Sequence, residues 1–277
     1  MTATHSGEHS VMKILVAVKQ VAALDEGFAI ASDGKGVDPD FLVRDLNEWD
    51  DYSLEEAIKI KEAAGGTVEV IAVTVAPEEA DEALRKCLAK GADRAIRVWD
   101  DAVAGSDPVA IARVLAAIAR KEGPALIFAG AQSSDQAVGA TGVAMAAFLG
   151  WPHAAVVTQL SYTPGAPSAV FRRELEGGVL HEVEIRCPAV FTIQLGINTP
   201  RYASLRSIKQ AAAKPIECLG LTDLGLAASD VGEAGSAARV RRMYVPDKGR
   251  AQLIGGTVAE QAARLAALIK ELAGGAA

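Results

Sequence analysis

The sequence feature that most constrains the fold is the run from Ala125 to Pro152. It begins with apolar residues typical of a buried strand, passes through a loop of Ser, Asp and Gln, and ends in a helix-forming run of small residues. The first turn of such a helix has backbone N–H groups without internal partners and carries the positive end of the helix dipole, which together favour a bound phosphate. A phosphate could approach the backbone closely at Gly139, Ala140, Thr141 and Gly142. A nucleotide site and a tightly packed buried helix both account for these residues.

Apolar runs alternate with amphipathic segments before and within this region. The apolar runs cover residues 12–18, 68–75, 94–98 and 126–129. Such continuous runs are typical of parallel strands covered on both faces, and the first is expected in the middle of the sheet. The order of strands and helices predicts an α/β fold with a doubly wound, mostly parallel sheet that holds its ligand at the carboxyl ends of the strands.

Three helices are expected between these strands. Ser53 and Glu56 have the spacing of a capping box for a helix that ends near residues 65–66. A second helix places Cys87 on its buried stripe, where packing is a better explanation than chemistry. A third begins at Asp107-Pro108, an N-cap followed by a first-turn proline.

After Pro152 the strands become longer and alternate more clearly. They are expected at residues 155–160, 170–175, 179–185 and 188–195, and the Glu176-Gly177-Gly178 turn predicts a hairpin. A polar loop with several cations follows, and residues 219–250 indicate an extended arm. Thr257 and Glu260 form a second capping box ahead of a terminal helix with one apolar stripe. That stripe must pack either on its own domain or on another chain.

Composition excludes several classes of protein. A net charge of −7 argues against nucleic acid as a main partner. The three cysteines are scattered and indicate neither disulfides nor a metal site. No apolar run is long enough for a signal peptide or a membrane span, so a cytoplasmic protein is expected, with residues 1–10 as a disordered extension.

The common catalytic motifs are absent from the chain. It contains no Gly-rich phosphate loop of the P-loop or dinucleotide type, no nucleophile elbow and no zinc-protease motif. None of the four histidines has a nucleophile or acid at a useful spacing. The pattern therefore indicates a nucleotide site without an evident means of cleaving the nucleotide.

Six segments in order resemble the β subunit of electron transfer flavoproteins. They are KILVAVKQV, DLNEWDDYSLEEAIKIKE, KGADRAIRV, FLGWP, RRELEGG and NTPRYASLRSIKQAAAKPIE. The resemblance extends from about Met12 to the end of the chain and is strongest to the bacterial branch that serves trimethylamine dehydrogenase. It implies a Rossmann-like fold of the adenine nucleotide α hydrolase type with a β-hairpin extension and a C-terminal arm ending in a helix.

The resemblance also implies cofactors and the residues that hold them. A partner α subunit would hold the redox-active FAD, and this chain would hold a structural AMP without a catalytic centre of its own. The AMP contacts would be Ala17, Asn47, Val75, Gln136, Val138, Gly139, Ala140 and Thr141. Leu24 and Trp49 would approach the FAD across the subunit interface.

The resemblance further implies how the chain meets its partners. Residues 11–218 would form the nucleotide-binding domain, and residues 219–277 would form an arm and helix docked on the α subunit. A recognition loop over residues 195–210 would dock a dehydrogenase such as trimethylamine dehydrogenase, and electrons would pass on to an acceptor resembling the flavoprotein's ubiquinone oxidoreductase. The docking residues would be Arg201, Tyr202, Leu205 and Arg206, with Leu205 as the anchor unless it packs under its own loop.

Two other functions stay open at this point. In an electron-bifurcating relative the same pocket would hold a second FAD. An enzyme acting on adenine nucleotides, similar to ATP pyrophosphatases, would share the architecture, but the chain lacks an SGGxDS-type loop.

Overall fold

The protein is described by a computed structural model over residues 11–23, 29–38, 43–246, 249 and 251–274. The chain divides into two compact units, residues 1–241 and residues 242–277. The expected disordered extension, residues 1–10, lies outside the described residues.

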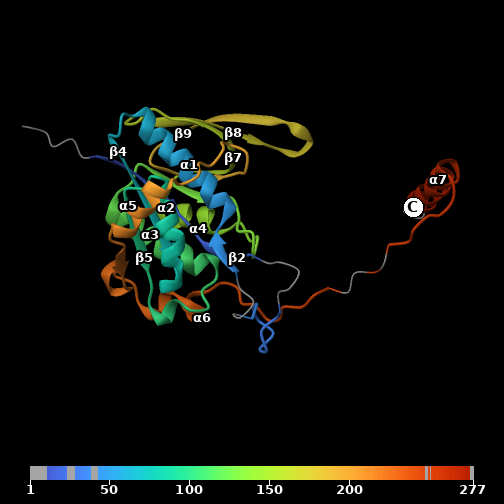
Figure 1. Ribbon diagram of the computed structural model, residues 1–277, viewed down its shortest axis with the longest axis horizontal. Coiled ribbons are helices and arrows are strands. Elements are labelled where there is room, and N and C mark those ends of the chain that lie inside the picture. Colours follow the sequence, from blue (N-terminus) through green and yellow to red (C-terminus); the bar gives the residue numbers. More distant parts are fainter. Residues whose placement is uncertain (1–10, 24–28, 39–42, 247–248, 250, 275–277) are drawn as a thin grey trace, which may run out of the picture. The chain divides into compact units, whose positions relative to one another are not determined.

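The first unit is built on one large sheet (Figure 1). Within the described residues nine strands are arranged in the order β11-β5-β4-β1-β6-β10-β7-β8-β9. In chain order they are β1 Met12–Ala17, β4 Val68–Val75, β5 Arg94–Val98, β6 Leu126–Gly130, β7 His153–Ser161, β8 Ser168–Glu174, β9 Leu180–Arg186, β10 Ala189–Ile193 and β11 Glu217–Leu219. The strands from β11 to β7 pair in parallel, whereas β7, β8 and β9 pair antiparallel. The expected strands and the central position of the first are confirmed.

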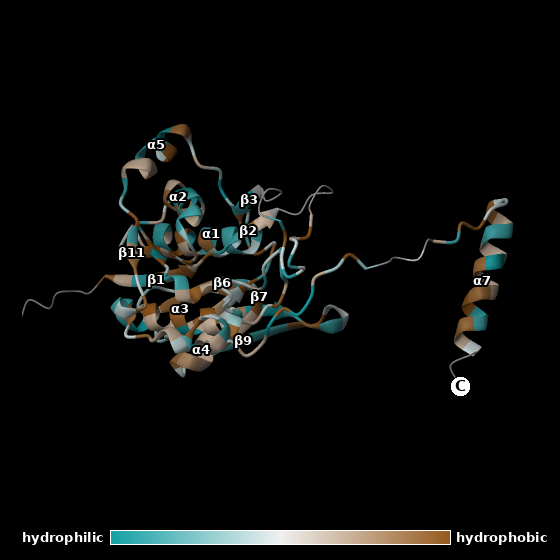
Figure 2. Ribbon diagram, turned by 90° about the horizontal axis from the view of Figure 1, so that it is seen from below, coloured by the Kyte–Doolittle hydropathy of each residue, from teal (hydrophilic) through white to brown (hydrophobic). Residues whose placement is uncertain are grey.

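Helices cover both faces of the sheet (Figure 2). α1 Glu48–Ala63 and α2 Asp81–Lys90 pack on one face through a core that contains Leu54 and Leu84. α3 Pro108–Glu122 and α4 Thr141–Leu149 pack on the other face through a core that contains Ile118 and Met145. The chain adds β4 and β5 on one side of β1 and then crosses to place β6 on the other. The sheet is therefore doubly wound, and its topological switch point lies between β1 and β6, where such folds bind ligands.

The starts of the helices confirm one expected cap and correct another. The Asp107 carboxylate accepts hydrogen bonds from the N–H groups of Val109 and Ala110 at the start of α3, as expected. The capping box expected at Ser53 is wrong, because α1 already begins at Glu48. Ser53 is buried inside this helix and its hydroxyl donates to the carbonyl of Trp49, one turn earlier.

The hairpin of β8 and β9 turns at residues 176–178, as expected (Figure 1). The sequence did not indicate where the chain goes next. β10 returns to the body of the sheet and inserts in parallel between β6 and β7. It brings Phe191 against Phe128 in an edge-to-face contact with ring centroids 5.8 Å apart, in the centre of the core.

Smaller elements complete the first unit. β2 Gln20–Ala23 and β3 Val43–Leu46 form an antiparallel pair, and α5 Leu205–Ala213 packs on α2. Short 3-10 turns lie at Glu78–Ala80, Asp101–Val103, Thr222–Leu224 and Ala228–Asp230, and α6 spans Gly232–Gly235. The expectation of an extended arm from residue 219 is wrong for residues 219–236. Leu221 and Val231 are buried in the same core as α3, and their burial holds this segment on the first unit.

Among its described residues, the second unit contains one helix, α7 Val258–Gly274. Its capping box is confirmed, because the Thr257 N–H donates to the Glu260 carboxylate at 2.8 Å and the Glu260 N–H donates to the Thr257 hydroxyl. Apolar residues gather on one side of the helix (Figure 2), at Val258, Leu265, Ile269 and Leu272, all of them exposed. No helix in the described ranges is long and apolar enough to cross a membrane.

Candidate functional site

A pocket of about 350 Å³ lies at the carboxyl ends of the parallel strands. Its walls come from the ends of β1, β4, β5 and β6, from the loop after β6 and from the start of α4. The volume lies within the range of small-molecule sites. The eight residues expected to contact AMP all line this pocket: Ala17, Asn47, Val75, Gln136, Val138, Gly139, Ala140 and Thr141. Tertiary structure thus gathers residues from four separate parts of the sequence.

One wall of the pocket is the open N-terminus of α4. The helix begins at Thr141, and no side chain caps it at Ala140. Its first N–H groups and the positive end of its dipole therefore remain available to an anion. Gly139 precedes the helix with φ +65°, a left-handed conformation that favours glycine.

The small residues of this region have two different causes. A Cβ atom at Gly142 would lie 2.5 Å from the Thr192 side chain on β10, so this glycine serves helix–sheet packing. Gly139 and Ala140 line the pocket, where their size keeps the backbone accessible. Helix–sheet packing therefore accounts for Gly142, whereas Gly139 and Ala140 belong to the wall of the pocket.

Asn47 fixes the loop after β6. Its side-chain amide donates to the carbonyl of Gln132 at 2.9 Å, and its side-chain oxygen accepts from the N–H of Ser134 at 3.1 Å. The residue is buried at the start of α1. Asn47 lines the pocket, and its two hydrogen bonds show that it shapes the loop after β6.

The sequence did not single out Asp50, which joins the two strands at the switch point. Its carboxylate accepts from the N–H of Lys19 at 2.7 Å, after β1, and from the N–H of Gly130 at 2.8 Å, at the end of β6. Asp50 is only 4% exposed, and this burial raises its pKa to about 7 despite both hydrogen bonds. A Cβ atom at Gly130 would lie 2.5 Å from the carboxylate, so only glycine fits there. A carboxylate in the first turn of a helix that follows a strand could have drawn attention to this residue.

Lys19 is a second pocket residue that sequence analysis missed. Its ammonium lies 2.8 Å from the Asp135 carboxylate and 3.3 Å from the side-chain oxygen of Gln136. Burial alone would raise the pKa of Asp135, but hydrogen bonds from Lys19 and Ser133 outweigh burial and lower it. Lys19 thus ties the loop after β6 to the end of β1 and balances the negative charge of Asp135 beside the pocket.

The residues expected near a flavin lie outside this pocket or outside the described chain. Trp49 is half-buried, and its indole N–H donates to the side-chain oxygen of Gln194 at 2.8 Å. This hydrogen bond fixes the ring beside the end of β10. Leu24 lies outside the described residues.

The expected recognition loop ends in a helix. Ser204 caps α5 by accepting from the N–H of Ser207 at 3.1 Å, and Leu205 is the first residue of that helix. Leu205 is 81% exposed and Tyr202 is 98% exposed. Leu205 therefore does not pack under its own loop. Arg201, in contrast, is held by carboxylates of α1.

The chain is similar to known proteins over most of its length. The electron transfer flavoprotein domain model matches residues 42–224. The beta subunit of electron transfer flavoprotein from Methylophilus methylotrophus is 64% identical over 263 residues, which cover 95% of this chain and 100% of that protein. The mitochondrial beta subunit of Arabidopsis thaliana is 40% identical over 77% of this chain and 83% of its own length.

The likeness extends to animal proteins. The beta subunit from Bos taurus is 36% identical over 78% of this chain and 84% of its own length. The high identity to the Methylophilus protein covers nearly the whole chain, including most of the second unit. The chain therefore belongs to the beta subunits of the electron transfer flavoprotein family.

Proposed function

We propose that this electron-transfer subunit binds one AMP in the pocket at the switch point and has no catalytic centre of its own. The observation that carries the proposal is the convergence of all eight expected contact residues on one pocket beside the open start of α4. The phosphate is placed at the N–H groups of Gly139, Ala140 and Thr141, where the helix dipole favours an anion. The Lys19 ammonium supports this placement because it offsets the charge of Asp135.

The adenosine is placed along the apolar part of the pocket. This part is lined by residues from the ends of β4 and β5 and from α3, namely Val75, Trp99, Ile111 and Leu115. Apolar and aromatic side chains remove a base from water while a few polar groups orient it. The pocket volume of about 350 Å³ is near the lower end of the range for ligand sites, which favours a mononucleotide over a dinucleotide such as FAD.

We further propose that the chain works as a heterodimer with an α subunit, in the cytoplasm of a bacterium. When bound by the α subunit, FAD supplies the electron chemistry. The part of this chain is to present the Trp49 ring, fixed by Gln194, toward that flavin. The apolar face of α7 is assigned to the α subunit, because an apolar stripe on a lone helix needs a partner surface.

The docking surface for a dehydrogenase is assigned to the start of α5. Tyr202, Leu205 and Ile208 expose apolar area there, and Arg206 and Lys209 flank them with positive charge. An exposed leucine between cations suits a partner with an apolar pocket and acidic rim. Trimethylamine dehydrogenase is the proposed electron donor, and an acceptor resembling the flavoprotein's ubiquinone oxidoreductase takes the electrons onward.

The AMP proposal predicts which nucleotides the heterodimer releases. Denaturing the purified heterodimer and separating its nucleotides should yield one AMP and one FAD. Gly139→Val should reduce the AMP content, because the residue lines the pocket and its Cβ would lie 3.2 Å from the Ala131 carbonyl oxygen. The matched control is Gly150→Val, at the far end of α4, which has a similar φ of +68° but open space around it.

The same measurement separates the proposal from its alternatives. Two FAD molecules and no AMP would support an electron-bifurcating subunit instead. Turnover of ATP by the heterodimer would support a nucleotide-hydrolysing enzyme. Equal loss of AMP in both glycine variants would show that backbone strain, and not the pocket, controls nucleotide content.

Leu205→Ala is expected to weaken docking by about 1–3 kcal/mol, the contribution of one buried apolar side chain. The side chain is 81% exposed in the free subunit, so its removal should leave the melting temperature unchanged. Stopped-flow reduction of the heterodimer by trimethylamine dehydrogenase at limiting concentration measures the effect. Leu180→Ala, an exposed leucine of the hairpin, serves as the control. A wild-type reduction rate in Leu205→Ala would remove Leu205 as the anchor.

A further inference from the structure

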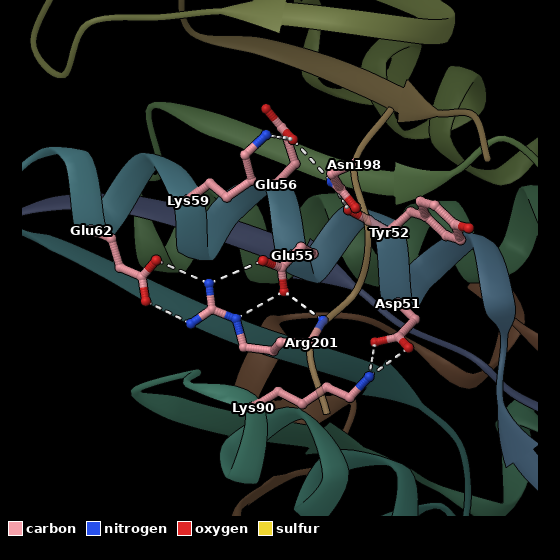
Figure 3. Close-up of polar contacts among 9 residues, drawn as sticks. All are labelled: Asp51, Tyr52, Glu55, Glu56, Lys59, Glu62, Lys90, Asn198 and Arg201. Carbon is pink, nitrogen blue, oxygen red and sulfur yellow. Dashed lines mark hydrogen bonds and ion pairs between the residues drawn. The ribbon is translucent and has the colours of Figure 1, made fainter. Parts of the chain in front are cut away.

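The segment that leads into the docking surface is fastened to α1 by Arg201. Its guanidinium binds two carboxylates at once (Figure 3). It donates to Glu55 at 2.9 and 3.0 Å and to Glu62 at 2.6 and 2.9 Å. The backbone N–H of Arg201 also donates to Glu55 at 3.1 Å, so that both the side chain and the main chain of this position are held.

Asn198 provides a second attachment three residues earlier. Its side-chain amide donates to the carbonyl of Tyr52 at 3.0 Å and to the Glu56 carboxylate at 2.9 Å (Figure 3). Its side-chain oxygen is buried and has no hydrogen-bond partner among the described residues. Burying an acceptor without a partner costs free energy, so the two hydrogen bonds that the side-chain NH2 group donates must outweigh this cost.

These attachments differ in kind from the charges of the docking surface. The Glu55 side chain is only 8% exposed, and a bidentate guanidinium is the geometry that best satisfies a buried carboxylate. Arg206 lies five residues further on and is exposed, and its guanidinium makes no hydrogen bond or ion pair with the described parts of the chain. Arg201 therefore faces α1, whereas Arg206 faces solvent.

We propose that Arg201 is a positioning residue, which fixes the start of α5 on α1 so that Tyr202 and Leu205 are presented in one orientation, and that it does not contact the dehydrogenase. This inference rests on the proposed docking function and assigns Arg201 a role different from the partner contact that the sequence suggested. Preorganised presentation lowers the entropy that docking must overcome. The carboxylates of Glu55 and Glu62, both on α1, hold the guanidinium and provide that preorganisation.

Neutralising the two glutamates separates positioning from direct charge contact. If Arg201 attracted an acidic partner, Glu55→Gln/Glu62→Gln would free its charge, and docking would be kept or strengthened. If Arg201 positions the segment, the same double variant releases it from α1. Amide hydrogen exchange of residues 199–213 in the intact heterodimer should then accelerate about tenfold, because breaking a buried pair from either side loosens the segment.

The docking readout uses trimethylamine dehydrogenase as the probe. The dehydrogenase concentration for half-maximal reduction of the heterodimer should rise about tenfold in Glu55→Gln/Glu62→Gln, with the limiting rate retained, since the flavin environment is unchanged. Arg201→Lys keeps the positive charge but loses the paired hydrogen bonds that the guanidinium makes to the two carboxylates, and it should behave like the double variant. Arg206→Gln is the matched control, and should leave hydrogen exchange unchanged while reducing the salt dependence of docking.

The possible outcomes distinguish this inference from the function on which it rests. Unchanged hydrogen exchange at residues 199–213 in both Glu55→Gln/Glu62→Gln and Arg201→Lys would overturn the positioning role. Faster exchange with unchanged half-maximal concentration would also overturn it, because loosening would not affect docking. If Leu205→Ala leaves docking unchanged as well, the docking surface itself is misassigned. Thermal melts and exchange in β1 and α3 identify any variant that is globally destabilised.

Discussion

Truncation of the chain after Gly255 is expected to lower the affinity of the heterodimer by at least about a hundredfold. The reason is the apolar stripe of α7, whose residues Val258, Leu265, Ile269 and Leu272 are all exposed. Burying a side chain of this kind contributes about 1.5–3 kcal/mol, so loss of the stripe exceeds the roughly 2.7 kcal/mol that a hundredfold change requires, even after ordering costs. Size-exclusion chromatography at decreasing concentration measures the dissociation.

Point variants provide a sharper test than truncation. Leu265→Asp/Ile269→Asp places charges in the stripe and should reproduce the truncation. Arg264→Gln/Lys270→Gln changes the polar residues next to the stripe and should leave the heterodimer intact. An intact heterodimer with a destabilised β chain after truncation would show instead that α7 belongs to its own chain's core.

Raising the pH from about 5 to about 8 is expected to remove about 3 kcal/mol of the stability contributed by Asp50. Burial raises the folded-state pKa of this carboxyl to about 7, whereas the unfolded value is 3.8. Between these values the folded protein holds a proton that the unfolded chain has lost, so stability falls as pH rises. Each pH unit in this range is worth about 1.4 kcal/mol, and the loss ends near pH 7.

The measurement is the difference in unfolding free energy between the wild-type heterodimer and Asp50→Asn, taken from urea denaturation at fixed protein and AMP concentrations. This difference should decline with pH through the stated range. Glu62→Gln is a control of opposite sign. The hydrogen bond from Arg201 lowers the pKa of Glu62, so any stability that this carboxylate contributes is lost only as the pH falls into the acid range. If the difference in unfolding free energy between the wild type and Asp50→Asn does not change with pH, the Asp50 carboxyl takes up no proton on folding.

Local sequence signals predicted the main elements of the fold. The apolar runs of β1, β4, β5 and β6 and the cap of α3 were read correctly because each depends on neighbouring residues only. The hairpin at residues 176–178 was predicted for the same reason. The start of α1 was placed too late, because the acidic residues that open this helix did not resemble a capping motif.

The candidate site was predicted in part. The loop and helix after β6 indicated a phosphate site, and the resemblance added the remaining pocket residues. Lys19 and Asp50 were missed, because their importance lies in hydrogen bonds to Asp135 and Gly130 that are more than 75 residues away in sequence. Arg201 was expected to contact a partner, and its bonds to α1 were not foreseen, since only the fold brings Glu55 and Glu62 within reach of its guanidinium.

The sequence by itself determined the alternation of buried strands and amphipathic helices and the open start of α4, because hydrophobic periodicity, caps and glycines act over a few residues. Tertiary structure alone decided that β10 enters between β6 and β7 and that Asp50 joins the two strands of the switch point. It also decided that Arg201 turns inward while Leu205 stays exposed. These outcomes depend on which distant groups meet when the core closes. The sequence alone does not distinguish a buried carboxylate from an exposed one, or an exposed leucine from a buried one.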